Sequence, residues 1–407
     1  MGQVFSPLDE ELGLLPGKYT PKLQAALSRW GAKLPFREAV EEIAYGYGTQ
    51  VGEATLRRVT YETGRAAEQL EQAVVNDLEA GIEVTEVNPA AQLVFSVDGS
   101  FIHLTNGEWR EVKSVAMGEF GSHWSAKERR WQTRTTKLSY FSRSYAVRQF
   151  ERGATAELMR RGLATAREVV TVNDGAEWIQ QFVDYQAPKA VRILDFSHAL
   201  ARVATAGKLI WGEGSEAFHN WFGRVRQQFQ QQPPQRTLAD LYLLRPKATS
   251  DEERAQIDRT LFYLESRLPH IDYPHFRYRH YPIGSGSVES GHKVVVQRRF
   301  KQAGMRWEAS HVDPLLALRD ALCNDRWPQT WPKTVTWRQQ QRWHFRRTQL
   351  PGKNVSPPLN LSLLKPIPSA SAPSSNQTSR PYRPPNNHPW KQGFWPTRFA
   401  WRWHPQN

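Results

Sequence analysis

The spacing of apolar residues changes along this chain and divides it into helical and extended regions. Between residues 20 and 64, apolar positions recur every three to four residues, the period of amphipathic helices. Three short helices are predicted there, beginning near Pro21, Pro35 and Gly52. Gly64 is expected to end the third helix.

The third of these helices has a clear inner and outer face. Leu56 and Val59 are expected to point inward, which leaves Arg57 and Arg58 on the outside. Basic side chains on the last helix of three are typical of a helix-turn-helix that reads a major groove. The preceding loop is longer than the usual three or four residues, and a plain helical bundle is the alternative.

From residue 91 the apolar positions alternate with polar ones, which is the pattern of half-buried strands. Strands are predicted at Ala91–Asp98, at Phe101–Thr105 and from Trp109 to about Met117. Asn106-Gly107 is a strong signal for a two-residue hairpin between the second and third strands.

The next elements alternate between helix and strand. A helix is predicted at Thr155–Ala166, a buried β-branched strand at Glu168–Asn173, a helix at Ala176–Tyr185 and a strand at Val191–Leu194. The expected order is three strands, helix, strand, helix, strand, with right-handed crossovers in the parallel part. Residues 199–280 are mostly helical by pattern and separate this core from the stretch that begins at Tyr281.

Composition indicates a polyanionic partner. The 407 residues include 54 Lys and Arg against 40 Asp and Glu, a formal net charge of +14, which favours nucleic acid over a membrane. Cys323 is the single cysteine, which excludes an internal disulfide and a cysteine-based zinc cluster. There is neither a long apolar run nor a signal-peptide pattern, so a soluble cytoplasmic protein is expected.

Two further segments concentrate positive charge. Residues 124–152 mix arginine and lysine with aromatic residues, a combination that suits phosphate contacts and base stacking; a solvated basic excursion is the alternative. Residues 351–407 are rich in proline and basic, with no acidic residue. The middle of that tail is expected to be disordered, and its aromatic end to contact DNA.

The stretch from Tyr281 to Trp307 carries the candidate chemistry. It reads as a loop with Gly284 and Gly286 that runs into a helix headed by Glu289. Spacing by four residues places three polar side chains on the face of Glu289, and further arginines follow. These residues are Lys293, Gln297, Lys301, Arg298, Arg299 and Arg306. An acid at the head of a basic helix suits a metal-binding carboxylate, and a solvated helix with an acid at its positive end is the alternative.

The sequence of this stretch resembles the glutamate block of bacterial insertion-sequence transposases. The resemblance lies in Gly-Ser-Gly-Ser-Val-Glu-Ser-Gly and in the following Arg-Phe-Lys-Gln-Ala-Gly-Met-Arg-Trp. The stretch is most similar to the ISKra family, relatives of the Mutator-like group. The resemblance implies a DDE enzyme, with an α/β RNase H-like core of five mixed strands and a helical insertion, preceded by an all-α helix-turn-helix domain.

The implied organisation has five parts. Residues 1–90 would be the DNA-binding domain and linker, and 91–198 the first part of the core. The helical insertion would span 199–280, the second part of the core with the glutamate helix 281–345, and the tail 346–407.

The resemblance also implies a set of catalytic acids. Asp98, Asp174 and Glu289 would hold two Mg²⁺ ions, for which Mn²⁺ can substitute. Asp195 and His198 match the relatives' acid-x-x-His signature and would support the site or contact the scissile phosphate. Each acid also has a structural alternative: a turn at Asp98, or a helix cap at any of the other three.

The predicted function is a transposase that binds the ends of its insertion sequence and catalyses Mg²⁺-dependent DNA cleavage and strand transfer. Its expected partners are double-stranded DNA at the element ends and the target, with a homo-oligomer in the complex, close to the bacterial nucleoid. The DNA-binding candidates are Arg57, Arg58, Lys293, Gln297, Arg298 and Lys301. The alternatives are a non-catalytic DNA-binding protein derived from a transposase and a structure-specific RNase H-like nuclease.

Overall fold

The computed structural model describes residues 14–15, 17–87, 89–127 and 129–349. The predictions made for the tail after residue 350 therefore lie outside the described residues. Within them, no helix is long and apolar enough to cross a membrane.

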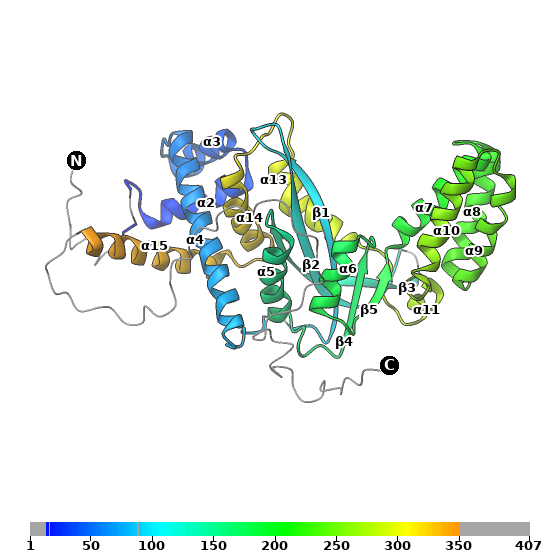
Figure 1. The fold of residues 1–407 in the computed structure, drawn as a ribbon. Coiled ribbons are helices and arrows are strands. Elements are labelled where there is room, and N and C mark those ends of the chain that lie inside the picture. The colour runs from blue at the N-terminus through cyan, green and yellow to red at the C-terminus, as the bar shows by residue number, and fades with distance from the viewer. Residues whose placement is uncertain (1–13, 16, 88, 128, 350–407) are drawn as a thin grey trace.

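The described chain is a mixed α/β protein built around a five-stranded sheet with the strand order β3-β2-β1-β4-β5 (Figure 1). The first three strands pair antiparallel, and β4 and β5 run parallel to β1. A mixed five-stranded core is therefore confirmed. The strands are β1 (Gln92–His103), β2 (Trp109–Ser125), β3 (Arg130–Arg143), β4 (Glu168–Asn173) and β5 (Val191–Leu194).

The predicted strand boundaries at the start of the sheet are wrong in one respect. β1 runs unbroken through Asp98 and Gly99, because β2 lies opposite and pairs Asp98 with Ser114 and Gly99 with Lys113. The predicted first two strands are thus one strand, and Asp98 lies within it instead of at its end. The third strand is β3, in the basic segment that the pattern left unassigned.

The predicted turn is confirmed in position but not in length. Asn106 and Gly107 lie in the turn between β1 and β2, with Gly107 at φ 88°. The predicted two-residue form is wrong, because the Leu104 N–H bonds to the Glu108 carbonyl at 2.8 Å and leaves three residues, 105–107, in the turn. The strands β4 and β5 have the predicted bounds. The helix before β4 is displaced, however: α5 is Val147–Arg160 and not Thr155–Ala166, and Gly162 at φ 80° follows its end.

The N-terminal helices are α2 (Pro21–Lys33), α3 (Phe36–Tyr47) and α4 (Glu53–Glu79). Thr20 caps α2, since its hydroxyl accepts from the Leu23 N–H. The prediction that Gly64 ends the third helix is wrong, because α4 continues for fifteen further residues, to Glu79. Gly64 instead allows close packing: a Cβ there would lie 2.3 Å from the carbonyl oxygen of Pro314 in α14 (Ala309–Cys323).

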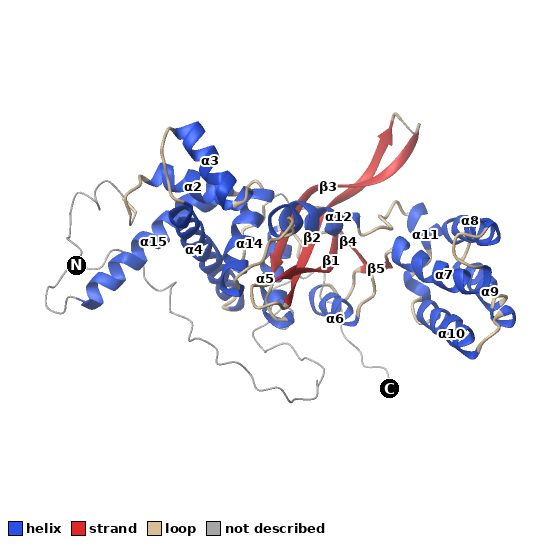
Figure 2. Cartoon of the chain, turned by 90° about the horizontal axis from the view of Figure 1, so that it is seen from above, coloured by secondary structure: helices blue, strands red, loops and turns tan. Residues whose placement is uncertain are grey.

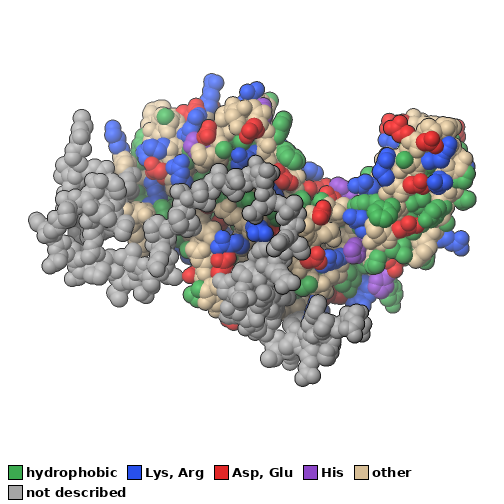
Figure 3. All heavy atoms as spheres, in the orientation of Figure 1, with side chains coloured by type: hydrophobic (Ala, Val, Ile, Leu, Met, Phe, Trp, Pro, Cys, Tyr) green, Lys and Arg blue, Asp and Glu red, His purple; other side chains and the backbone are tan. Residues whose placement is uncertain are grey.

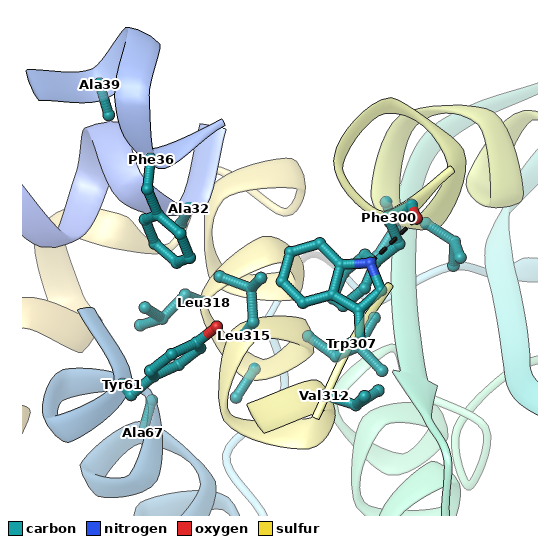
Figure 4. Close-up of a cluster of buried hydrophobic side chains, with 14 of the residues drawn as sticks. Ala32, Phe36, Ala39, Tyr61, Ala67, Phe300, Trp307, Val312, Leu315 and Leu318 are labelled. Atoms are coloured by element: carbon teal, nitrogen blue, oxygen red, sulfur yellow. Dashed lines mark hydrogen bonds between the residues drawn. The ribbon is translucent and has the colours of Figure 1, made fainter. Parts of the chain in front are cut away.

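These helices share one apolar cluster with the C-terminal part of the core (Figure 4). Phe36 and Tyr61 meet Leu315 of α14, and Trp307 completes the cluster while its indole N–H donates to the Phe300 carbonyl at 3.0 Å. The cluster extends to Ile102 of β1 on the sheet. The N-terminal helices are therefore anchored to the element that carries the glutamate block.

The opposite face of the sheet is covered by α5 and α6 (Glu177–Gln186). Leu93, Phe95 and Val97 point to this side, where Phe150 and Phe182 pack on them, while Val94 belongs to another cluster. This is the inward and outward alternation that the strand pattern predicted.

After β5 the chain leaves the sheet for a helical lobe, as expected for residues 199–280 (Figure 2). Figure 3 shows the surface hollowed between this lobe and the rest of the molecule. The lobe contains α7 (Phe196–Trp211), α8 (Glu216–Gln231), α9 (Pro234–Tyr242), α10 (Asp251–Glu265) and α11 (Tyr273–Tyr278), with short 3-10 turns at Arg245–Lys247 and Leu268–His270.

The chain then returns to the sheet as one interrupted helix. Its parts are α12 (Gly286–Gly291), the π-helical segment η3 (His292–Gln297) and α13 (Arg298–Phe300). The helices α14 and α15 (Trp327–Gln349) follow.

One residue of the basic segment 124–152 is not available to a partner. Arg143 is fully buried at the end of β3, where it pairs with Glu71 of α4 and with Asp320 of α14, the latter at 2.7 Å. Burial would lower the pKa of Arg143, but the two carboxylates raise it well above its ordinary value. Burial raises the pKa of Asp320 to about 7, against the opposing effect of Arg143. Arg143 therefore joins α4, the sheet and α14.

Two helix-interior glycines should respond oppositely to alanine. Gly64→Ala should lower the free energy of unfolding by about 1–3 kcal/mol, because the added methyl group overlaps the Pro314 backbone. Gly223→Ala in α8 should raise it by about 0.5–1 kcal/mol, because nothing lies within 4 Å and the unfolded chain loses entropy. Chemical denaturation of both variants checks this, and stabilisation by Gly64→Ala would contradict the packing.

Candidate active site

The candidate site lies where β1 and β4 run side by side. Their register pairs Phe95 with Thr171, so three residues further along Asp98 comes level with Asp174. Asn173 joins the strands at this point, since its side-chain oxygen accepts from the Val97 N–H at 2.7 Å. The parallel ladder thus brings two of the predicted acids to one sheet edge.

The environment of Asp98 shows which charges surround it. Its carboxylate accepts from the Gly99 N–H at 2.7 Å. Burial raises the pKa of Asp98 to about 6, with additional upward contributions from the negative charges of Asp174 and Glu289, while His198 lowers it. The structure therefore brings Asp174, Glu289 and His198 within electrostatic reach of Asp98.

Asp174 is held at the end of β4 by a local turn and by the helical lobe. Its carboxylate accepts from the Ala176 N–H at 2.9 Å, and its carbonyl accepts from the Tyr263 hydroxyl of α10 at 2.8 Å. The alternative interpretation, that Asp174 is only a helix cap, is not confirmed: α6 begins at Glu177, and its N-cap is Ala176, which makes no side-chain cap.

Glu289 is exposed on α12, which packs against β1 and β2. Small residues make the close approach possible: the Ser287 and Ser96 hydroxyls lie 3.4 Å apart, and a Cβ on Gly291 would lie 2.8 Å from the Tyr140 ring. Ser285 occupies the N-cap position of α12 without a side-chain cap bond. Its backbone N–H has another partner, Asp195.

Asp195 is buried, and both of its carboxylate oxygens accept from backbone N–H groups. One accepts from His198 at 2.8 Å, at the start of α7, and the other from Ser285 at 2.6 Å, at the start of α12. Asp195 therefore fixes the start of α12, the helix that carries Glu289. Each carboxylate oxygen of Asp195 already accepts a hydrogen bond in this arrangement. The predicted helix cap at Asp195 is present. The second donor to its carboxylate, the Ser285 N–H, lies 90 residues further along the sequence.

His292 is a residue that sequence reasoning missed. Its ring Nδ1 lies 3.4 Å from the Asp98 carboxylate, and its Nε2 is buried without a partner among the described residues. Burial lowers the pKa of His292 to about 4, so the ring is neutral. The sequence did contain one signal for His292: it follows Glu289 by three residues, which is about one turn along the same predicted helix.

The acids are a suitable set for a hard divalent cation. Mg²⁺ takes oxygen ligands and keeps several waters, so a few carboxylates suffice. Burial is the main cause of the raised pKa of Asp98, and the negative charges of Asp174 and Glu289 add to it; a bound cation would relieve that repulsion. In the described part of the chain, no three His, Cys, Asp or Glu side chains are close enough to hold one ion together.

The predicted DNA-binding residues fall into two groups. Lys293, Gln297, Arg298 and Lys301 are exposed along η3 and α13, although the π-helical turn there departs from the four-residue spacing assumed for them. Arg299 is the exception to the predicted basic face. It is buried, donates to the Gly31 carbonyl at 3.1 Å, and burial lowers its pKa to about 10.

Arg57 and Arg58 lie apart from the acids, near the start of α4. Both are half-exposed and ion-paired one turn away, Arg57 with Glu53 and Arg58 with Glu62. Together with Arg65, Tyr61 and His311 they line an open hollow of about 540 Å³.

No protein-family model matches the chain, and a search of curated proteins found no match.

Replacement of Asp195 tests its role as a clamp. Asp195→Asn should lower the free energy of unfolding by about 1–3 kcal/mol, because one buried N–H would then face an amide donor. Asp272→Asn is the matched control: this N-cap of α11 accepts from the His275 N–H alone at 3.3 Å and is equally well replaced by asparagine. Equal thermal melts of the two variants would contradict the clamp.

Proposed function

We propose that this protein is a DDE transposase with an RNase H-like core, which binds the ends of its insertion sequence and cleaves and joins DNA. The observation that carries the proposal is the grouping of Asp98, Asp174 and Glu289 at one edge of the sheet. They come from β1, the end of β4 and a helix that follows a helical insertion. This is the order that the resemblance to insertion-sequence transposases implies, and the strand order supports it.

Asp98, Asp174 and Glu289 would hold two Mg²⁺ ions, or Mn²⁺ in their place. When bound, such ions activate the attacking hydroxyl and stabilise the leaving oxygen of a phosphodiester. The residues of the chain supply positioning. Asp195 holds the start of α12, and the neutral His292 supports Asp98 from the buried side. His198 is exposed beside Asp98, where it would contact the scissile phosphate.

DNA would reach this site along a basic path. Lys293, Gln297, Arg298 and Lys301 follow Glu289 on the exposed side of the same helix, where they would contact phosphates near the cleaved bond. The N-terminal helices would act as the helix-turn-helix that reads the element ends, with Arg57 and Arg58 on the recognition helix. Binding as a homo-oligomer near the nucleoid belongs to the same proposal.

Removal of one carboxylate charge tests catalysis. Glu289→Gln and Asp174→Asn should each abolish Mg²⁺-dependent cleavage of DNA that carries the inverted repeats flanking the gene, while binding to that DNA persists. Glu216→Gln, an exposed acid at the start of α8, is the matched control and should cleave normally. Gel assays with both readouts decide the outcome.

The same assay separates the alternatives. A wild-type protein that binds the repeats without nicking them would be a DNA-binding protein only. One that cuts junctions without preference for repeat ends, and joins no strands, would be a structure-specific nuclease.

Recognition of the element ends is tested on α4. Loss of Arg57 or Arg58 should cost about 1–3 kcal/mol of binding free energy and relax sequence preference if the side chain contacts base edges. Arg37→Ala on α3, where the side chain is 87% exposed, is the control and should bind as the wild type. Unchanged binding of the double alanine variant would make this region a plain helical bundle.

A further inference from the structure

The strands β2 and β3 extend beyond the rest of the sheet as a two-stranded ribbon (Figure 2). β1 pairs with β2 only as far as Glu119, whereas β2 and β3 remain paired to Ser125 and Arg130. Near the tip, Trp124 and Trp131 are directly paired, with ring centroids 5.8 Å apart at 68°. They are 55% and 63% exposed, an unusual display of large apolar rings for a surface without a partner.

One face of this ribbon forms a groove with the loop that leads to the glutamate helix. Tyr281, in that loop, packs edge-on against Phe120 of β2, with their rings 5.8 Å apart at 88°. The groove has a volume of about 870 Å³. Its lining includes the aromatic residues Trp131, Tyr278 and Tyr281. Tyr278 is 82% exposed and comes from α11, not from the ribbon.

The charge and polarity of the lining favour one kind of occupant. Arg277 and His280 lie in the wall, and hydroxyl groups come from Thr133, Thr135 and Ser287. None of the described residues that line the groove is acidic. Flat aromatic rings, hydrogen-bonding hydroxyls and positive charge together are the means by which proteins bind unpaired nucleotides, whose base faces are free to stack.

The groove reaches the start of α12, the helix that carries Glu289. Gly284, Gly286 and Ser290 line it, and Ser290 directly follows Glu289. A Cβ on Gly286 would meet nothing within 4 Å, and its φ is not positive, so the chain's own packing does not require glycine there. The open space beside Gly286 suits the close approach of a strand.

We propose that this groove binds unpaired nucleotides of the DNA strand whose phosphodiester lies at the carboxylates. Bases stack on Trp131 and Tyr278, and Arg277 contacts the backbone phosphate. The ribbon thus holds a locally opened end in place. This inference rests on the proposed function for its substrate, and it adds that the enzyme acts on DNA whose bases are unpaired next to the cleaved bond.

Binding of a fluorescently labelled oligothymidine to the full-length chain, measured by anisotropy in EDTA, tests the groove without any cleavage. Trp131→Ala and Tyr278→Ala should each weaken binding roughly 5- to 150-fold, the range expected for loss of one stacked base. Trp131→Phe should retain most of the affinity for oligothymidine. The affinity for a blunt duplex should change little in any of these variants. Since both side chains are exposed, thermal melts should match the wild type.

Trp109→Ala is the matched control. Trp109 lies on β2, the strand paired with β3, and is 65% exposed, but it stacks on His103 at 4.8 Å and does not line the groove. It should bind oligothymidine as the wild type does. Equal affinities of the Trp131, Tyr278 and Trp109 variants for oligothymidine would overturn the inference. It would also be overturned if polyglutamate competed with oligothymidine and this competition were lost in Trp131→Ala, since the groove would then bind an acidic peptide.

Failure of this inference is distinguishable from failure of the proposed function. A protein that cleaves its repeat ends, but whose Trp131→Ala and Tyr278→Ala variants bind single strands normally, would refute the groove and keep the transposase. A protein that binds oligothymidine through Trp131 but never cleaves repeat DNA would keep the groove and refute the enzyme.

Discussion

The architecture of the site depends on the buried carboxylate of Asp195. The chain leaves the sheet after β5, passes through the helical lobe and must return to the same edge. Asp195 receives the Ser285 N–H at the point of return and the His198 N–H at the point of departure. Two neighbouring bonds reinforce it: the Phe196 N–H donates to the Ile283 carbonyl, and the Tyr273 hydroxyl donates to the Leu194 carbonyl, both at 2.9 Å. Because a buried carboxylate without donors is costly, this clamp strongly favours one position for the start of α12.

The helix that carries Glu289 is adjusted to its surroundings by the π-helical segment η3. In a π-helix the backbone hydrogen bonds join residues five apart instead of four. Such segments often occur at functional sites. Here Arg319 of α14 donates to the Val295 carbonyl at 3.2 Å and also to the Val294 carbonyl, so these groups are satisfied from outside. The same guanidinium donates to the Ala32 carbonyl at the end of α2 at 3.3 Å. The N-terminal helices and the glutamate helix are therefore linked through one buried side chain.

Positive charge serves two purposes in this protein. Arg143, Arg299 and Arg319 are buried and join elements that lie far apart in sequence. Other basic residues are exposed, among them those after Glu289 and near the start of α4, and these are available to a polyanion. The net charge therefore overstates the positive charge that lies on the surface, and the location of each arginine matters more than the total.

The sequence by itself determined the elements whose causes are local. The period of apolar residues placed the N-terminal helices, the β-branched runs placed β4 and β5, and Asn106-Gly107 placed the turn between β1 and β2. The residue types of the candidate acids were likewise visible in the sequence. These features depend on neighbours within one or two turns of chain, which a pattern records directly.

Tertiary structure alone decided the rest, because the deciding partners are distant in sequence. Asp98 and Gly99 continue β1 instead of turning, since β2 supplies a ladder opposite them. Gly64 lies within a long helix because Pro314 packs on it. Arg299 is buried in contact with α2, where the Gly31 carbonyl, 268 residues away in sequence, accepts a hydrogen bond from its guanidinium. His292 meets Asp98 only when α12 and η3 lie on β1. Burial of a charge and closure of a site depend on which surfaces meet, and no local period encodes that.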